Sequence, residues 1–303
     1  MRAALSAIEV LRPRGLSHAL ELIASEPQPV PLAGGTDLFV ALNAGAEPRT
    51  RFLDLSPLAA LRGIRSSREG VTIGSLTTFR EIREHAGLRH LPALVAAAAE
   101  VGGWQIQNRA TLGGNIANAS PAGDALPVLL AHEARVKIAS VRGEREIAID
   151  RLFTGYRQLA IERDELIVSI HVPWPTRGAV ALFRKVGTRR AQSISKVVFC
   201  GVLHVAGRGM ERVRLAYGSM APVPVRARAA ENALEGSALP APQGAGSPGS
   251  PDVSESSAAA ARRALSKDLA PIDDIRSDRD YRMDIAGRLI EQLLRVAAFS
   301  PRR

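Results

Sequence analysis

The sequence predicts an α+β fold made of two α/β units followed by a smaller α+β domain. Up to residue 172, short strand-like segments with alternating apolar residues are interspersed with helical patterns. Pro173-Trp174-Pro175 then interrupts the pattern like a linker. Beyond it, three strand-like segments come first and helices follow, the order expected of a sheet covered by helices. We therefore divide the chain into residues 1–57, 58–172 and 173–303.

The first unit, residues 1–57, contains signals for two helices and a strand. Ser17 is placed to cap a helix whose buried face carries Ala19, Leu20, Leu22 and Ile23. The segment 29–32 leads extended into a Gly-Gly turn, a second helix begins at Asp37, and Phe52-Leu53 is typical of a strand.

The second unit, residues 58–172, alternates strands and helices. Predicted helices begin at Ser56-Pro57 and at Thr78, an Ala-rich helix covers 92–101, and Asp124 is placed to cap a helix over 126–130. Strands are predicted over 71–76 and 166–172, with a hairpin from 136–138 and 146–149.

In the third unit, strands are predicted over 180–186, 196–205 and 211–217, and the last helix over 278–299. Pro, Gly, Ser and Ala dominate residues 240–257, which predicts a mobile loop.

The composition restricts the classes of protein that fit. The 303 residues are 46% hydrophobic and 23% charged, as in ordinary globular chains. No apolar run reaches the length of a membrane span and no secretory segment is evident, so a cytoplasmic location is expected. The one cysteine, Cys200, excludes an internal disulfide and a four-thiolate cluster. The six histidines form no ligand set, so redox metals are expected only on partners.

The net charge of +10 does not indicate nucleic-acid binding. The basic residues are spread along the chain and nearly all are Arg, with Lys at only four positions, and few aromatic residues are available for stacking. An anionic cofactor or an acidic partner surface explains the charge better.

Two stretches containing a Gly-Gly pair are the strongest functional signal. They are LAGGTDL at 32–38 and TLGGNIANASP at 111–121. Successive backbone N–H groups in such turns converge into a site that suits phosphate. Neither stretch matches the common phosphate-binding fingerprints, and an isolated Gly-Gly pair is most often only a turn. Two such stretches in one chain predict two clamps on the diphosphate of a dinucleotide-type cofactor.

Taken as whole strings, these stretches resemble the FAD-binding, or medium, subunit of the molybdenum hydroxylase family. Further landmarks of the resemblance follow in order: RFLDLS at 51–56, VTIGSLTTFREI at 71–82, ERDELIVSIHVP at 162–173, FRKVGTRRAQSISK at 183–196 and RVRLAYGSMAPVPVRARAAE at 212–231. The resemblance covers nearly the whole chain. It implies a two-subdomain FAD-binding domain of the vanillyl-alcohol-oxidase-like type, also called PCMH-type. A smaller C-terminal domain like that of the carbon monoxide dehydrogenase flavoprotein follows, with a three-stranded sheet covered by helices.

The resemblance also implies which residues contact FAD. One clamp comprises Leu32, Ala33, Gly34, Gly35, Thr36, Asp37 and Leu38, and the other comprises Ala110, Thr111, Gly113, Gly114 and Asn115. Asn118 and Asp124 match positions that line the site, Ile167 one that packs near the flavin, and Lys185 a lysine near the flavin ring. Asp124 is equally well explained as a helix cap, and a buried strand residue at Ile167 would look the same in sequence. For Lys185, a solvated residue at the end of a strand is the less favoured alternative. No catalytic residue and no metal ligand is assigned to this chain.

The resemblance implies a hetero-oligomer, expected to be a dimer of heterotrimers. A molybdopterin-binding large subunit and a 2Fe-2S small subunit would deliver electrons to FAD, with NAD as the expected acceptor. The loop 187–193 carries two arginines and no acidic residue, which leaves the electron acceptor open.

The strings at 183–196 and 212–231 look closer to bacterial xanthine dehydrogenase members than to carbon monoxide dehydrogenase, so purine is the favoured substrate. Medium subunits of carbon monoxide, aldehyde or N-heterocycle dehydrogenases, a stand-alone flavin oxidoreductase and a non-catalytic adaptor are the alternatives.

Overall fold

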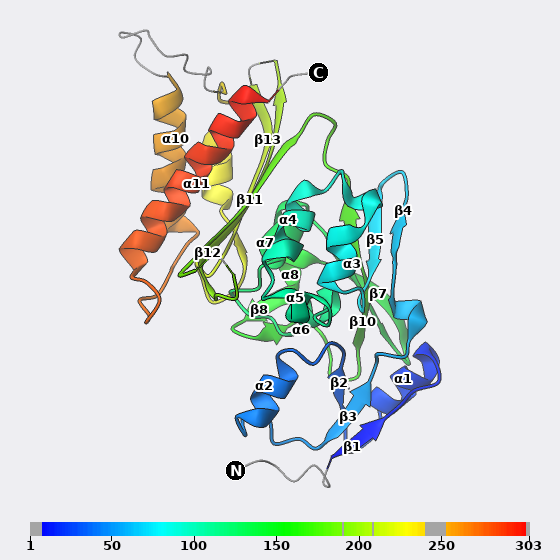
Figure 1. The fold of residues 1–303 in the computed structure, drawn as a ribbon. Helices are drawn as coiled ribbons and strands as arrows, with labels where there is room; N and C mark the ends of the chain where they lie inside the picture. Colours follow the sequence, from blue (N-terminus) through cyan, green and yellow to red (C-terminus); the bar gives the residue numbers. More distant parts are fainter. Residues whose placement is uncertain (1–7, 190, 208, 240–252, 301–303) are drawn as a thin grey trace.

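The computed structural model describes residues 8–189, 191–207, 209–239 and 253–300. Within these residues the chain forms three main sheets, each with its own helices, and one small hairpin (Figure 1). No helix of this described part is both long and apolar enough to cross a membrane.

The first unit is a parallel sheet in the order β1-β3-β2. Its elements are β1 (Glu9–Leu11), α1 (Leu16–Ile23), β2 (Val30–Leu32), α2 (Leu38–Asn43) and β3 (Arg51–Asp54). Helix α1 is capped at Gly15, so the prediction that Ser17 caps it is wrong: Ser17 lies inside the first turn. The predicted apolar face of α1 packs on Leu53 of β3 and on Leu61 and Leu76 of the second unit, which joins the two units.

The second unit is an antiparallel sheet in the order β4-β5-β10-β6-β7. Its strands are β4 (Ile64–Ser66), β5 (Gly70–Gly74), β6 (Arg135–Ser140), β7 (Gly143–Ala148) and β10 (Leu166–Pro173). Its helices are α3 (Phe79–Glu84), α4 (Pro92–Glu100), α5 (Trp104–Gln107), α6 (Leu112–Ala117), α7 (Leu126–Ala131) and α8 (Ile149–Leu152), followed by a hairpin of β8 (Phe153–Gly155) and β9 (Gln158–Leu159). In Figure 1, α3, α4 and α7 lie on one side of this sheet.

Local sequence explains where several of these helices begin. Thr78 caps α3 in a capping box with Glu81, and Pro92 occupies the first turn of α4, as predicted. The helix predicted from Ser56-Pro57 is only a short 3₁₀ turn, Ala59–Leu61. A three-residue segment offers too few positions to bury an apolar face and continue as an α-helix.

The third unit is an antiparallel sheet in the order β11-β12-β13-β14, packed against helices (Figure 1). Its elements are β11 (Val180–Gly187), β12 (Ser195–Ala206), β13 (Gly209–Gly218), β14 (Val225–Arg226), α9 (Arg228–Leu234), α10 (Val253–Ala264) and α11 (Arg279–Phe299). The sequence predicted three strands; the fourth, β14, is two residues long and too short to show alternation. Helix α11 begins after Asp278, whose side chain accepts a hydrogen bond from Tyr281 N at 2.7 Å, as predicted.

The predicted loop 240–257 is corrected in its last part. Residues 240–252 lie outside the described residues, but 253–257 form the first turns of α10. The alanine run that follows continues this helix, since alanine is the best helix former, and the Pro and Gly residues all precede residue 253.

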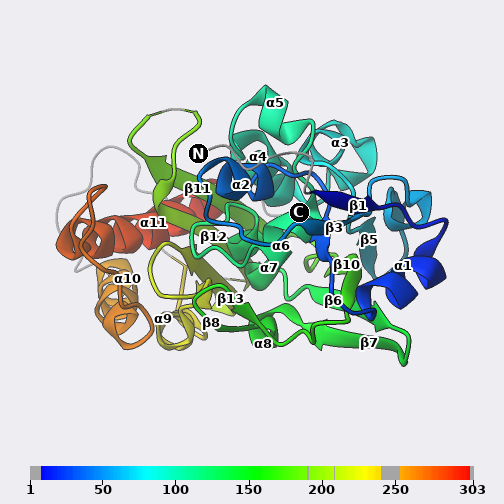
Figure 2. The same cartoon turned by 90° about the horizontal axis from the view of Figure 1, so that it is seen from below.

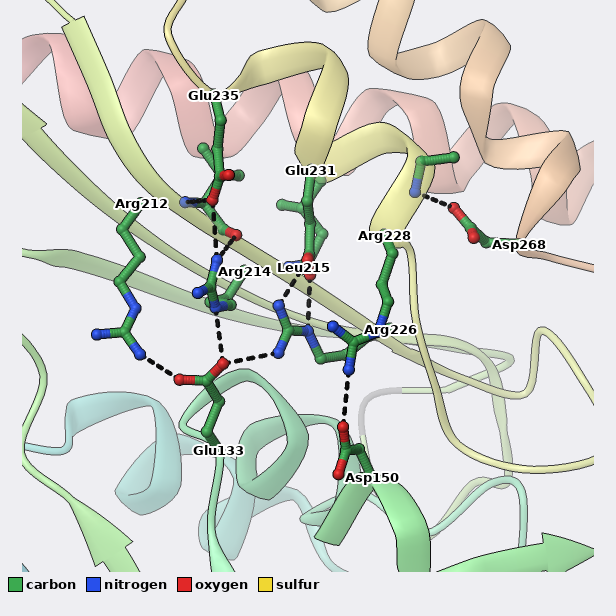
Figure 3. Close-up of polar contacts among 12 residues, drawn as sticks. Glu133, Asp150, Arg212, Arg214, Leu215, Arg226, Arg228, Glu231, Glu235 and Asp268 are labelled. Carbon is green, nitrogen blue, oxygen red and sulfur yellow. Dashed lines mark hydrogen bonds and ion pairs between the residues drawn. The ribbon is translucent and has the colours of Figure 1, made fainter. Parts of the chain in front are cut away.

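A group of ion pairs joins the second and third units (Figure 3). Glu133, in the turn after α7, accepts hydrogen bonds from Arg214 Nε and Arg226 Nη1, both at 2.9 Å, and also pairs with Arg212. Arg226 is buried and binds Glu231 as well, at 2.8 and 2.5 Å. Burial alone would raise the pKa of Glu133, but Arg214 and Arg212 lower it overall. The carboxylate therefore stays ionised and holds the two units in a fixed relation.

Candidate functional site

The first Gly-Gly stretch forms an open turn at the end of β2. Leu32 closes the strand, its carbonyl accepting from Leu55 N at 2.9 Å, and the turn 33–37 leads into α2. Among the described residues, the backbone N–H groups of 33–37 donate no hydrogen bond. Gly35 adopts a φ of 75°, which favours glycine. Five unpaired N–H groups in succession are the chemistry expected of a phosphate-binding turn.

Gly34 brings the two predicted stretches together. A Cβ atom at this position would lie 2.1 Å from the carbonyl oxygen of Arg109 and 3.0 Å from Cα of Ala110. Only glycine permits so close an approach between two backbones. The turn after β2 therefore rests directly on the segment that precedes Thr111.

The second Gly-Gly stretch is helical, so the prediction of a second turn is wrong. Thr111 is the N-cap of α6, and its hydroxyl accepts from Gly114 N at 3.0 Å. Gly113 N donates to Ser75 O at 2.8 Å, and Leu112 N donates to Thr77 O at 3.0 Å. The backbone N–H groups of 112–115 thus donate within the chain. Among the described residues, the N–H group of Thr111 has no acceptor, so it and the side chains are the groups of this stretch that can donate to a ligand.

Side chains link the two stretches on the exposed side of the junction. Asn118, just after α6, donates from Nδ2 to Asp37 Oδ1 at 3.1 Å, and Arg157 donates to Asn118 Oδ1 at 2.9 Å. Figure 2 shows the junction from below, with α2 beside α6. The sequence predicted Asp37 and Asn118 as site residues but gave no signal for Arg157. This arginine follows the short strand β8 and has a positive φ of 54°.

Asp124 and Lys185 form a buried ion pair. Lys185 Nζ, on β11, lies 2.7 Å from Asp124 Oδ2 and 2.9 Å from the carbonyl oxygen of Glu100 at the end of α4. Burial raises the pKa of Asp124 to about 6, against the opposing effect of Lys185. The lysine is therefore not a solvated strand-end residue, and its charge is already matched. Asp124 does not cap α7 either, because Ala125 occupies the N-cap position without a side-chain bond.

Two buried acceptors among the predicted residues lack partners in the described part of the chain. They are Asn115 Oδ1 on α6 and Asp124 Oδ1. A buried polar atom without a partner is costly, so a ligand with N–H or O–H groups would stabilise both positions. The N–H groups of 33–37 suit a diphosphate, and the two acceptors suit a ring that carries hydrogen-bond donors. FAD has both parts.

The remaining predicted residue lies on the central strand of the second sheet. Ile167 is half-buried, packs against the main core and adjoins a bulge in the pairing of β10 with β6. No hydrogen bond within the described residues joins the Asp124–Lys185 pair to the turn at 33–37. The predicted residues thus form two groups, one at the Gly34 junction and one at the ion pair, connected by the segment 118–124.

Comparisons with known proteins identify the family of the chain. Residues 6–175 match the FAD binding domain in molybdopterin dehydrogenase, and 182–244 match the carbon monoxide dehydrogenase flavoprotein C-terminal domain. The chain is 32% and 31% identical to xanthine dehydrogenase FAD-binding subunits from two Escherichia coli strains, over 93% of this chain and of each relative. It is 30% identical to the nicotine 6-hydroxylase medium subunit of Paenarthrobacter nicotinovorans, covering 96% of this chain and 97% of that one.

Among solved structures, carbon monoxide dehydrogenase from Hydrogenophaga pseudoflava matches with a TM-score of 0.87 at 27% identity, covering 96% of each chain. This agreement extends over both the FAD-binding domain and the C-terminal domain. The chain therefore belongs to the family of FAD-binding medium subunits of molybdenum hydroxylases and is an oxidoreductase component.

Proposed function

We propose that this chain is the FAD subunit of a cytoplasmic purine dehydrogenase of the xanthine dehydrogenase type. When bound, FAD would take electrons from the iron–sulfur clusters of a partner and pass them to NAD. The observation that carries the proposal is the run of free backbone N–H groups at 33–37, packed through Gly34 against the second predicted stretch. Support for purine comes from the xanthine dehydrogenase relatives.

In this proposal the chain holds FAD at two places. The turn within 32–38 binds the diphosphate through its N–H groups, and the hydroxyls of Thr36 and Thr111 add donors. The second stretch, Ala110 to Asn115, supports the turn and supplies the Thr111 N–H group and the side chain of Asn115. Asn118 keeps Asp37 in position.

At the other place, the chain presents polar and apolar contacts to the ring. Asp124 keeps one carboxylate oxygen free for a donor, because Lys185 engages only the other one. Lys185 thereby acts as a positioning residue that keeps Asp124 ionised. Ile167 offers an apolar contact. The chain's own contribution is to bind and orient the cofactor, and no residue here is assigned to substrate chemistry.

The partners in this proposal are a molybdopterin-binding large subunit and a 2Fe-2S small subunit, in a dimer of heterotrimers. The division into 1–57, 58–172 and 173–303 belongs to the same proposal. Substrate identity depends on the large subunit, so a nitrogen heterocycle is the second candidate, since the nicotine 6-hydroxylase medium subunit is similar over nearly the whole chain.

Co-expression tests this function. The chain would be produced together with a molybdopterin-binding large subunit and a 2Fe-2S small subunit. NADH formation would then be followed at 340 nm with xanthine, hypoxanthine or nicotinate. We expect NADH formation with the purines. Turnover only with nicotinate would favour a nitrogen heterocycle as the substrate. Purine oxidation with an artificial dye but not with NAD would contradict NAD as the electron acceptor.

The isolated chain provides the matching control. It should bind FAD and yet show no purine-dependent NAD reduction, because a single flavin site cannot oxidise a purine. Substrate-dependent turnover by the single chain, with no molybdenum or iron in elemental analysis, would contradict the proposal and favour a stand-alone flavoenzyme.

A further inference from the structure

The second sheet has one face covered by helices, and the first unit packs on part of the other face, which carries several basic side chains beyond that contact. Val71, Val136 and Ile170 point into the core beneath the helices. Their neighbours along the strands, Thr72, Lys137 and His171, therefore point to the opposite face. There they line a cavity of about 260 Å³, with Arg65, Arg135 and Glu146 also in its wall.

Strand register explains why these side chains gather. Arg65 on β4 is opposite Thr72 on β5, Thr72 is opposite His171 on β10, and His171 is opposite Arg135 on β6. One row of side chains thus crosses four strands with an arginine at each end. Across three strand spacings, the two arginine Cα atoms are roughly 14 Å apart. Thr72 and His171 at the centre of the row are linked at 3.3 Å.

A second row extends the same site. Ser169 on β10 is opposite Lys137 on β6, which is opposite Glu146 on β7. The wall of the cavity therefore contains three permanent cations but a single carboxylate. Both Ser169 and Thr72 can donate hydrogen bonds between the cations.

The ion pairs present at this face are weak competitors for a ligand. Lys137 lies 2.5 Å from Glu144, and Arg135 lies 3.8 Å from Glu146, but all four side chains are more than a third exposed. Pairs of this kind contribute about 0–1 kcal/mol, so an anion with two charges can displace them. Within the described residues, Arg65 has no acidic partner.

We propose that this cavity is a second ligand site, which binds a phosphorylated small molecule of about nucleotide size. The cavity, at about 260 Å³, is larger than one phosphate group fills, and its two arginines stand at opposite ends of the row. The hydroxyl and imidazole groups between them suit a sugar or a second phosphate. None of the residues that line this cavity belongs to the proposed FAD site, so the two sites can be tested separately.

Calorimetric titration of the full-length chain, saturated with FAD, tests this site. FAD saturation occupies the turn at 33–37, so a second phosphate ligand must bind elsewhere. The probes are sodium pyrophosphate and AMP, with sulfate for comparison, at constant ionic strength. We expect pyrophosphate and AMP to bind more tightly than sulfate. Arg65→Ser and Lys137→Met should each weaken AMP binding about tenfold, since each removes a charge-assisted contact.

Glu146→Gln supplies a gain-of-binding test, because it removes the carboxylate from the wall and should tighten AMP binding severalfold. A misfolded variant could not produce this result. Arg263→Ser, at an exposed arginine of α10, is the matched control and should leave binding unchanged. Absence of binding by both probes, sulfate binding as tight as AMP, or equal weakening by Arg263→Ser would overturn the proposal.

Discussion

The two Gly-Gly stretches look alike in sequence and differ in structure. The first follows an edge strand and leaves five successive N–H groups without an acceptor among the described residues. The second opens helix α6 inside the core, where Ser75, Thr77 and Thr111 accept its N–H groups. The helix after the first stretch, α2, buries none of its residues, whereas α6 buries Leu112, Gly113 and Ile116.

This difference separates two tasks that glycine performs. In the first stretch glycine leaves the main chain open to a ligand, and in the second it lets a helix approach strand β5 closely. A ligand-binding turn has to keep its donors free, and so it depends on a rigid neighbour for its shape. The contact between Gly34 and Arg109 is where the neighbour supports the turn.

The largest expected effect comes from breaking that contact. In Gly34→Ala, the new Cβ would lie 2.1 Å from the carbonyl oxygen of Arg109, and neither backbone can move without opening the junction. FAD affinity should fall by about a thousandfold, roughly 4 kcal/mol. Flavin absorbance per protein after gel filtration measures this. Gly15→Ala, where a Cβ meets nothing within 4 Å, is the control and should retain its flavin. A flavin-saturated Gly34→Ala protein would contradict the role of the contact.

The next effect concerns the ion pair beyond the second stretch. Lys185→Met leaves Asp124 buried without its counter-ion, which should lower the free energy of unfolding by about 3 kcal/mol at pH 8. At pH 5 the loss should be smaller, because the variant's Asp124 would already be protonated. Urea denaturation at the two pH values measures both quantities. An equal loss at pH 5 and pH 8 would show that Lys185 stabilises by packing alone.

A third prediction uses two buried groups whose titrations oppose each other. Burial raises the pKa of Asp124 from 3.8 to about 6, so its favourable contribution is present below pH 4 and is lost as the pH rises through 6. Burial lowers the pKa of His132 from 6.5 to about 4, so its contribution is present above pH 6.5 and is lost on acidification through 4. The two contributions largely cancel in the wild-type protein.

Asp124→Asn should expose the histidine contribution. The unfolding free energy of this variant should fall by about 3 kcal/mol between pH 6.5 and pH 4, more steeply than in the wild type. His132→Phe should show the opposite slope, with stability falling as the pH rises through 6. Parallel pH profiles for the wild type and both variants would mean that neither group titrates as its burial implies.

A fourth prediction distinguishes the two glycines of the helical stretch. A Cβ at Gly113 would lie 2.6 Å from Cβ of Ser75, so Gly113→Ala should cost about 1–3 kcal/mol of unfolding free energy. At Gly114 the nearest atom is the Thr111 hydroxyl oxygen at 2.9 Å, and alanine favours a helix by about 1 kcal/mol over glycine, so Gly114→Ala should be nearly neutral. Loss of flavin from a stable Gly114→Ala protein would show instead that the cofactor approaches this glycine directly.

The sequence predicted the order of units and most long elements, because alternation and capping residues such as Thr78 and Asp278 act locally. It did not predict the helical form of the second stretch. That form depends on Ser75 and Thr77, which accept its N–H groups from another part of the chain. The sequence also did not predict that Lys185 pairs with Asp124, because the two residues are 61 positions apart. The packing of β11 beside α4 brings Lys185 into this part of the fold.

The smallest expected effect comes from the side-chain link between the two stretches. Asn118→Ala removes the hydrogen bonds to Asp37 and from Arg157, and on this partly exposed side each contributes about 0.5–1 kcal/mol. If Asn118 only steadies the turn at 33–37, FAD affinity should fall a few fold while the melting temperature hardly changes. Asn43→Ala, an exposed residue at the end of α2, is the control and should change neither. If Asn118→Ala lowered FAD affinity as much as Gly34→Ala, the side chain of Asn118, and not the contact between Gly34 and Arg109, would determine the shape of the turn.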